Sequence, residues 1–128
     1  MKRSLQLLAL IVSASFCLQA SAATITVNGS GDTIALDTFA TLREAITSIN
    51  NQADVNADVT GNRLGLYASE PGGTPDVIDF SVTGTILLAS ALPALPDLSD
   101  DVAISGPGAN ALTVKRDPSA AKFPNFHT

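Results

Sequence analysis

Two stretches of the sequence begin alike, continue as alternating apolar residues and end at a Gly-containing turn. Asp76-Val77 opens the first stretch and Asp101-Val102 opens the second, 25 residues later. Repeats spaced about 20 to 50 residues apart are typical of solenoids, in which each repeat buries its apolar face only against its neighbours. The spacing therefore favours a mainly β coil. Short strands with frequent turns are also typical of a small antiparallel β-sandwich, which remains the alternative.

Strands are predicted wherever β-branched and apolar residues alternate with polar ones between turn residues. The second short stretch, 33–36, follows the turn Gly29-Ser30-Gly31-Asp32, and a corner is expected at Leu92-Pro93-Ala94-Leu95-Pro96 because proline is excluded from central strands. The predicted strands are 23–28, 33–36, 76–82, 85–88, 101–105 and 111–115.

One helix is predicted before this β region, over 41–50. Its apolar residues recur at helical spacing and form one stripe: Leu42, Ala45, Ile46 and Ile49. Thr41 and Glu44 have the spacing of a capping box, in which each satisfies a free backbone N–H at the helix start. We therefore expect the helix to be a lid that covers one end of the β region.

The neighbouring charges Arg43 and Glu44 lie on this helix. Adjacent helical residues point about 100° apart, so the two do not face each other as a catalytic pair. We expect each of them to bond to the loop or the first strands instead. The predicted structural cap consists of Leu42, Arg43, Glu44, Ala45 and Ile46.

Residues 1–22 have the pattern of a secretory signal peptide. Met1-Lys2-Arg3 is basic, 5–18 is mostly apolar, and Ala20-Ser21-Ala22 is a small-residue cleavage site. The apolar run is shorter than the ~20 residues of a membrane span, so no transmembrane segment is expected in the mature chain. The protein is therefore expected to be exported. Its one cysteine, Cys17, would be removed, which leaves no disulfide and no thiol chemistry.

The charge balance of the mature chain excludes some partners. The full sequence has seven basic residues, of which Lys2 and Arg3 lie in the signal peptide, so cleavage leaves five basic residues against twelve acidic ones. Such a chain is not expected to bind nucleic acid or an anionic membrane surface. His127 is the only histidine and lies in the last residues, so a Ser-His-Asp arrangement is not expected.

A polar stretch, 51–75, separates the helix from the repeat and is predicted to be a long loop. Asp54, Asn56 and Asp58 place oxygen atoms at alternate positions, as at the start of a calcium loop. The full EF-hand pattern fails, because Val59 and Gly65 stand where Gly and Glu are required. A looser calcium site at these three residues is the only metal or cofactor hypothesis, and a solvated polar loop is its alternative.

Several stretches, in this order, resemble bacterial secreted right-handed parallel β-helix proteins of the pectin-lyase-like class. Ala40-Thr41-Leu42-Arg43-Glu44-Ala45-Ile46 is similar to their Cys-Ser-Leu-Arg-Glu-Ala motif, with Ala40 in place of the cysteine. Thr74-Pro75-Asp76-Val77-Ile78-Asp79-Phe80 is similar to their first rung. The corner at 92–96 resembles their Leu-Pro corner, and Val102-Ala103-Ile104-Ser105-Gly106-Pro107-Gly108-Ala109 resembles their Ile-x-Gly-Pro-Gly-Ala rung.

The resemblance implies an extracellular scaffold or adhesin-like protein, at the bacterial cell surface and associated with the outer membrane. Its ligand, a carbohydrate or a protein, is unknown. This segment would be its non-catalytic cap and first coils. The expected divisions are a signal peptide at 1–22, strands and capping helix at 23–50, the polar loop at 51–75, coils at 76–116 and an irregular tail at 117–128. Related chains continue for further coils, so we expect a fragment whose last coil exposes apolar residues.

Two other functions stay open. Polysaccharide lyases of similar fold use acidic calcium ligands and a basic residue, so the segment could belong to such a lyase or to a hydrolase. The acids and bases available for that chemistry are Asp76, Asp79, Asp97, Asp100, Asp101, Lys115 and Arg116. Alternatively, the chain is a complete small all-β binding domain.

Overall fold

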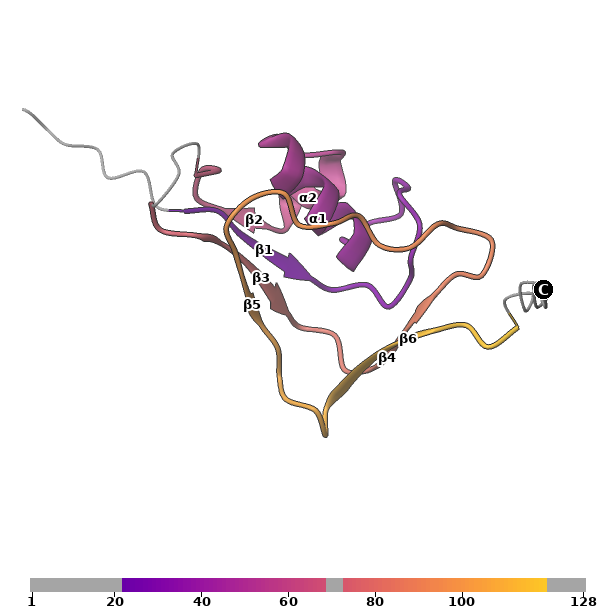
Figure 1. Cartoon of the computed structure of the whole chain (residues 1–128). Coiled ribbons are helices and arrows are strands. Elements are labelled where there is room, and N and C mark those ends of the chain that lie inside the picture. Colours follow the sequence, from indigo (N-terminus) through magenta and orange to yellow (C-terminus); the bar gives the residue numbers. More distant parts are fainter. Residues whose placement is uncertain (1–21, 69–72, 120–128) are drawn as a thin grey trace, which may run out of the picture.

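The computed structural model describes residues 22–68 and 73–119, which form a mainly β fold with two short helices (Figure 1). Residues 1–21 of the expected signal peptide and residues 120–128 of the expected tail lie outside the described residues. The elements, in chain order, are β1 (Thr24–Val27), α1 (Leu42–Asn51), α2 (Ala57–Gly61), β2 (Arg63–Leu64), β3 (Asp76–Phe80), β4 (Gly84–Leu88), β5 (Val102–Ser105) and β6 (Leu112–Arg116). Neither helix has the length and apolar character that crossing a bilayer requires.

The strands form two sheets, and the chain bends from the larger sheet into the smaller one twice. One sheet has the order β2-β1-β3-β5, and the other consists of β4 and β6. β3 leads through a bend into β4, and β5 leads through a second bend into β6 (Figure 1). β5 pairs parallel with β3, and β6 pairs parallel with β4, so the second strand pair repeats the course of the first.

The pairing along the described strands is mostly parallel. β1 with β3, β3 with β5 and β4 with β6 are parallel, and only the two-residue strand β2 runs antiparallel to its neighbour β1. Antiparallel partners would be needed for a sandwich, so the predicted alternative of an antiparallel β-sandwich is wrong for these strands.

The register differs by one residue from the sequence repeat. Asp76 pairs with Val102 and not with Asp101, so that Ile78 lies beside Ile104. A shift of one residue turns every side chain of a strand to the other face of the sheet. The observed register places isoleucine beside isoleucine on the inner face, where apolar contact favours it.

The core lies between α1 and the inner faces of the two sheets. The predicted apolar stripe of α1 is buried, and Ile49 and Ala45 are fully enclosed. The stripe packs with residues of three strands and of α2: Ile25, Val27, Ile78, Ile86 and Val59. Thus α1 covers the inner face at the start of the β region (Figure 1).

Two predictions for the segments around α1 were wrong. The stretch 33–36 is not a strand, because its backbone bonds instead to polar side chains such as Glu44. The stretch 51–75 is not an unstructured loop, because it contains α2 and β2. Asn56 is the N-cap of α2 and accepts hydrogen bonds from the N–H groups of Asp58 and Val59, which is enough to start a short helix.

Candidate functional site

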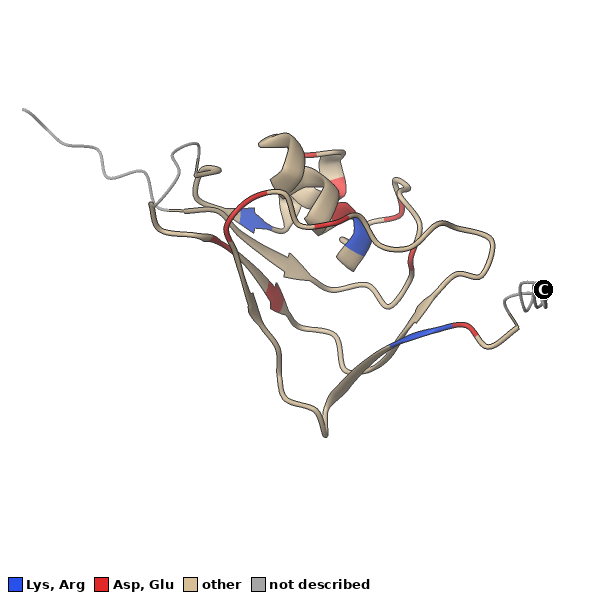
Figure 2. Ribbon diagram, in the orientation of Figure 1, with Lys and Arg blue, Asp and Glu red and all other residues tan. Residues whose placement is uncertain are grey.

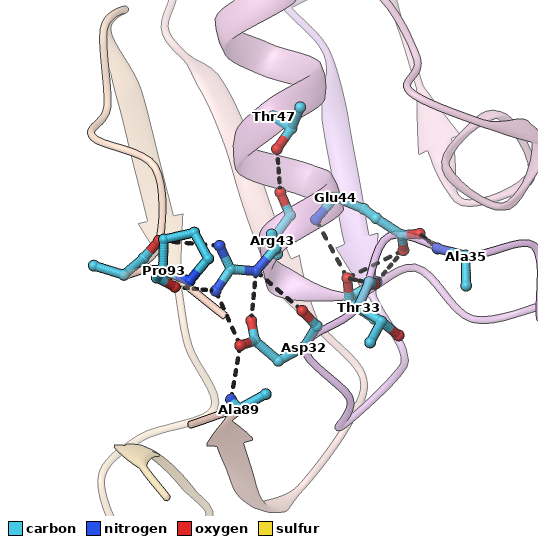
Figure 3. Close-up of polar contacts among 10 residues, drawn as sticks. Asp32, Thr33, Ala35, Arg43, Glu44, Thr47, Ala89 and Pro93 are labelled. Carbon is cyan, nitrogen blue, oxygen red and sulfur yellow. Dashed lines mark hydrogen bonds and ion pairs between the residues drawn. The ribbon is translucent and has the colours of Figure 1, made fainter. Parts of the chain in front are cut away.

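Arg43 lies on the first turn of α1 and forms a buried ion pair with Asp32. Its Nε atom lies 2.9 Å from Asp32 Oδ1, and its Nη2 atom lies 2.9 Å from Asp32 Oδ2 (Figure 3). The two side chains are only 8% and 2% exposed. A paired guanidinium and carboxylate of this geometry form two parallel charge-assisted hydrogen bonds, which hold both groups in one orientation.

The same two side chains reach a third segment, between β4 and β5. Arg43 donates to the carbonyl oxygens of Pro93 (2.8 Å) and Ala94 (3.0 Å), and Asp32 Oδ2 accepts a hydrogen bond from the N–H of Ala89 (2.8 Å) (Figure 3). Arg43 also donates to the Asp32 carbonyl oxygen at 3.0 Å. The pair therefore joins α1, the loop after β1 and the connection from β4 to β5.

Glu44 points away from Arg43 and serves the other side of the helix start. Its Oε2 atom accepts from the Thr41 N–H at 2.8 Å, while the Thr41 side chain accepts from the Glu44 N–H, so the predicted capping box is confirmed. Its Oε1 atom accepts from the N–H of Ala35 (2.9 Å) and from Asn56 Nδ2 (2.7 Å). The carboxylate is fully buried, and its two oxygens hold the 33–36 segment and the start of α2.

The three residues of the calcium hypothesis face different partners. Asn56 uses Oδ1 to cap α2 and Nδ2 to bond to Glu44 and to the Ala35 carbonyl. Asp58 Oδ2 accepts from the N–H groups of Asp37 (2.7 Å) and Thr38 (3.0 Å). Within the described residues no group of three or more His, Cys, Asp or Glu side chains is arranged for a metal ion. Calcium binding at these residues stays a prediction.

Asp54, the remaining residue of the calcium hypothesis, forms an ion pair with Arg63 on β2. Asp54 Oδ1 lies 2.7 Å from Arg63 Nε and accepts from the Tyr67 hydroxyl at 2.6 Å, and the guanidinium stacks 4.9 Å from the centre of the Tyr67 ring. The hydrogen bonds from Arg63, with a smaller contribution from Tyr67, lower the pKa of Asp54. Burial, followed by the bond to Asp54, raises the pKa of the Tyr67 hydroxyl. This group attaches β2 to the segment that follows α1.

Replacing Asp54 with asparagine should reduce stability by about 1.5–3 kcal/mol near neutral pH, because a hydrogen-bonded charge is lost. Asp54 has an ordinary pKa of 3.8 and a lower one when folded. Its contribution is therefore present above about pH 4 and is lost as the pH falls through the lower, folded value. Urea unfolding from pH 2 to pH 7 measures this, with the exposed carboxylate variant Asp101→Asn as the control. A stability difference that stays constant down to pH 2 would contradict the prediction.

The acids and bases of the lyase hypothesis are spread over the structure. Asp76 is buried and accepts from the N–H groups of Ala23 (2.8 Å) and Ala68 (3.1 Å), so it holds the strand starts together. Lys115 and Arg116 are exposed on β6, and in the described part of the chain no ion pair joins them to an acid. The basic residues of the described segments lie apart, on α1, β2 and β6 (Figure 2).

Of the remaining acids of that hypothesis, Asp79 and Asp100 accept hydrogen bonds through their carboxylates, and Asp97 accepts one through its main-chain carbonyl. Asp100 Oδ2 accepts from Gln52 Nε2 at 2.7 Å, and the Asp97 carbonyl accepts from Asn50 Nδ2 at 2.7 Å. Asp79 accepts from the N–H of Phe80. The contacts of Asn50 and Gln52 attach the end of α1 to the segment before β5. Among the described residues, none of these contacts places a base between two acids.

Sequence reasoning missed Asp32, which it treated only as a turn residue. Its importance depends on Arg43, eleven positions later, and on a segment more than fifty positions later. The only sequence signal was an acidic residue in a glycine-rich turn directly after a strand.

Comparison of the chain with protein-family models, with curated proteins and with solved structures found no match.

Proposed function

We propose that this chain is the N-terminal cap and the first coils of an exported, right-handed parallel β-helix scaffold of the cell surface. The observation that carries the proposal is the repeated course of β3–β4 and β5–β6, with parallel register in both sheets. Each further strand pair in such a course buries its inner face on the pair before it, which is how a solenoid grows. α1 covers the beginning of this stack.

The charged side chains of the cap support a structural and non-catalytic role. Arg43, Asp32 and Glu44 are buried, and their polar atoms bind backbone groups of segments that have to be held beside the helix. A general acid or base needs a reacting group within hydrogen-bond reach, whereas these groups already contact the protein itself. Their role in the proposal is to fix the position of the lid on the first coil.

A cysteine pair in register tests both the coil stacking and the export. Thr85 and Thr113 are exposed partners on β4 and β6, and neighbouring strands lie about 4.8 Å apart, a distance that a disulfide can bridge. The variant Thr85→Cys with Thr113→Cys, made with residues 1–22 present, should be oxidised by a bacterial periplasm. Without residues 1–22, its thiols should stay free in the cytosol. Counting free thiols under denaturing conditions measures both.

The matched control is Thr85→Cys with Lys115→Cys, which lies two residues out of register. Two residues add roughly 6.6 Å along the strand, so these α-carbons are about 8 Å apart and beyond disulfide reach. Equal oxidation of both pairs would contradict the stacked register. Free thiols in the in-register pair with residues 1–22 present would contradict the export or the stacking, and cell fractionation separates these two causes.

A further inference from the structure

A small hollow lies in the cap, between the loop after β1 and the segment that enters α1. It is lined by the loop 28–31, by Asp37, Phe39 and Thr41, and by Val82 after β3. Its volume is about 210 Å³, below the roughly 300–1,000 Å³ of pockets that hold small-molecule ligands, so it suits a single side chain. The hollow lies at the carboxyl ends of β1 and β3, whereas further coils of the proposed scaffold would stack on β5 and β6.

The two sides of the hollow are held together by backbone contacts. The N–H groups of Asn28 and Gly29 donate to the Ala40 carbonyl at 3.1 and 3.2 Å, and Asn28 Oδ1 accepts from the Ala40 N–H at 2.7 Å. Phe39 packs directly on Gly29, where an added β-carbon would lie only 2.9 Å from the Phe39 β-carbon. The hollow is therefore formed before any ligand binds, which lowers the cost of binding.

One side of the hollow combines a carboxylate with an aromatic ring. Asp37 Oδ1 accepts from the Phe39 N–H at 3.1 Å; within residues 22–68 and 73–119 the Oδ2 atom has no hydrogen bond and Asp37 forms no ion pair. Thr38, between them, has a φ of 77°, which is rare for a β-branched residue. Asp58 Oδ2 maintains this turn by accepting from the N–H groups of Asp37 and Thr38. Backbone strain of this kind is concentrated at ligand sites.

The surroundings of the hollow are negatively charged. The segment 28–41 contains two acidic residues, Asp32 and Asp37, and no basic residue (Figure 2). The basic residues described in the cap, Arg43 and Arg63, are each already paired with an aspartate. The charge of Asp37, together with that of the neighbouring Asp58, therefore favours a cation as the occupant of the hollow.

Exposed apolar side chains continue the surface beside the hollow. Ile34, Leu36 and Phe39 are 48%, 74% and 51% exposed. Ile34 also lines a second hollow, of about 400 Å³, with Leu92 and Pro93. A small amine would fill only the first hollow, whereas a polypeptide can place a basic side chain there and apolar side chains along 33–39. Apolar surface beside polar groups is typical of protein interaction sites.

We propose that this hollow binds an arginine side chain of a partner polypeptide, whose neighbouring apolar residues contact Ile34 and Leu36. The guanidinium stacks on the Phe39 ring and donates hydrogen bonds to Asp37. Guanidinium groups combine aromatic stacking with directional bonds to a carboxylate, which an ammonium group does not match. The cap thus has a binding role besides covering the first coil, and this inference does not depend on the proposed scaffold.

The probe is the tripeptide leucine-arginine-leucine with acetylated and amidated ends. It is titrated into the nitrogen-15-labelled protein, and the amide resonances are followed by NMR. Those of Gly29, Gly31 and Phe39 should shift and saturate at millimolar peptide, while those of Gly61 and Gly106, which do not line the hollow, should not move. The same peptide with citrulline, which has the shape of arginine without its charge, should bind about tenfold more weakly.

The matched protein variants are Asp37→Asn and Asp101→Asn. Asparagine at position 37 keeps an oxygen that accepts from the Phe39 N–H but removes the charge. It should weaken the arginine peptide about tenfold and leave the weak binding of the citrulline peptide unchanged. Asp101→Asn removes the same charge from an exposed residue that does not line the hollow and should not change binding. Phe39→Leu keeps the β-carbon that packs on Gly29 and should weaken the arginine peptide by removing the ring.

The absence of saturable shifts at Gly29 and Gly31 would overturn the proposal. So would equal binding of the arginine and citrulline peptides, or unchanged binding by an Asp37→Asn variant whose other resonances are unaltered. Equally tight binding of arginine amide alone would assign the hollow to a small guanidinium compound. Shifts that rise with protein concentration without peptide, together with a dimer in sedimentation, would assign it to a second copy. If the engineered disulfide between β4 and β6 forms but the peptide does not bind, the scaffold stands and only this inference fails.

Discussion

Replacing Arg43 with methionine should lower the free energy of unfolding by about 3–5 kcal/mol. The substitution keeps much of the apolar length of the side chain but leaves Asp32, whose side chain is 2% exposed, as a buried carboxylate without its cation. Losing one member of a buried ion pair has about this cost because the remaining charge is still desolvated. It also removes the donors to the Pro93 and Ala94 carbonyls. Urea denaturation followed by circular dichroism measures the change.

The exposed residue Arg116 provides the control, because Arg116→Met removes the same charge from β6 and should change stability by no more than about 0.5 kcal/mol. Adding Asp32→Asn to Arg43→Met should recover part of the loss, since the unpaired charge disappears. Equal stability of Arg43→Met and the unmodified protein would show that the pair does not hold the cap.

Replacing both Leu42 and Ile46 with aspartate should detach α1 from the sheets and cause aggregation. Both side chains are buried, at 6% and 4% exposure, in the core that α1 forms with β1, β3 and β4. Truncating a buried leucine or isoleucine to alanine already costs about 2–5 kcal/mol, and a buried charge costs more. Two such changes exceed the stability of most domains of this size, which is roughly 5–15 kcal/mol. Light scattering and a thermal melt of the purified protein measure the result.

The matched variant adds the same two charges at exposed positions, with Asn51→Asp at the end of α1 and Ala57→Asp at the start of α2. It should remain monomeric and melt within a few degrees of the unmodified protein. A soluble Leu42→Asp, Ile46→Asp variant with an unchanged melting curve would contradict the role of α1 as the lid of the first coil.

Much of the local structure could be predicted because it depends on neighbours in the chain. The alternation of Ile25 and Val27 with polar residues identified β1, and the stripe from Leu42 to Ile49 identified α1. The capping box of Thr41 and Glu44 needs only residues three positions apart. α2 was missed because a helix of five residues with one buried apolar side chain, Val59, has too little periodicity to recognise.

The candidate site could be predicted only in part. The sequence indicated that Arg43 and Glu44 would not act as a pair, since adjacent helical residues diverge. It did not indicate the partners that they bind, because Asp32, Asn56 and Pro93 come beside the helix only when separate segments pack around it. Hydrogen bonds of this kind depend on the path of the whole chain.

By itself, the sequence determined the local elements of this protein: the amphipathic helix with its capping box, the alternating strands and the turns between them. These follow from side-chain periodicity and backbone preference, which act over a few residues. Only the tertiary structure decided that Ile78 lies beside Ile104, that Asp32 is the partner of Arg43, and that Ile78 and Ile86 are buried. The physical reason is that register, burial and ion pairing are set by contacts between residues far apart in the chain.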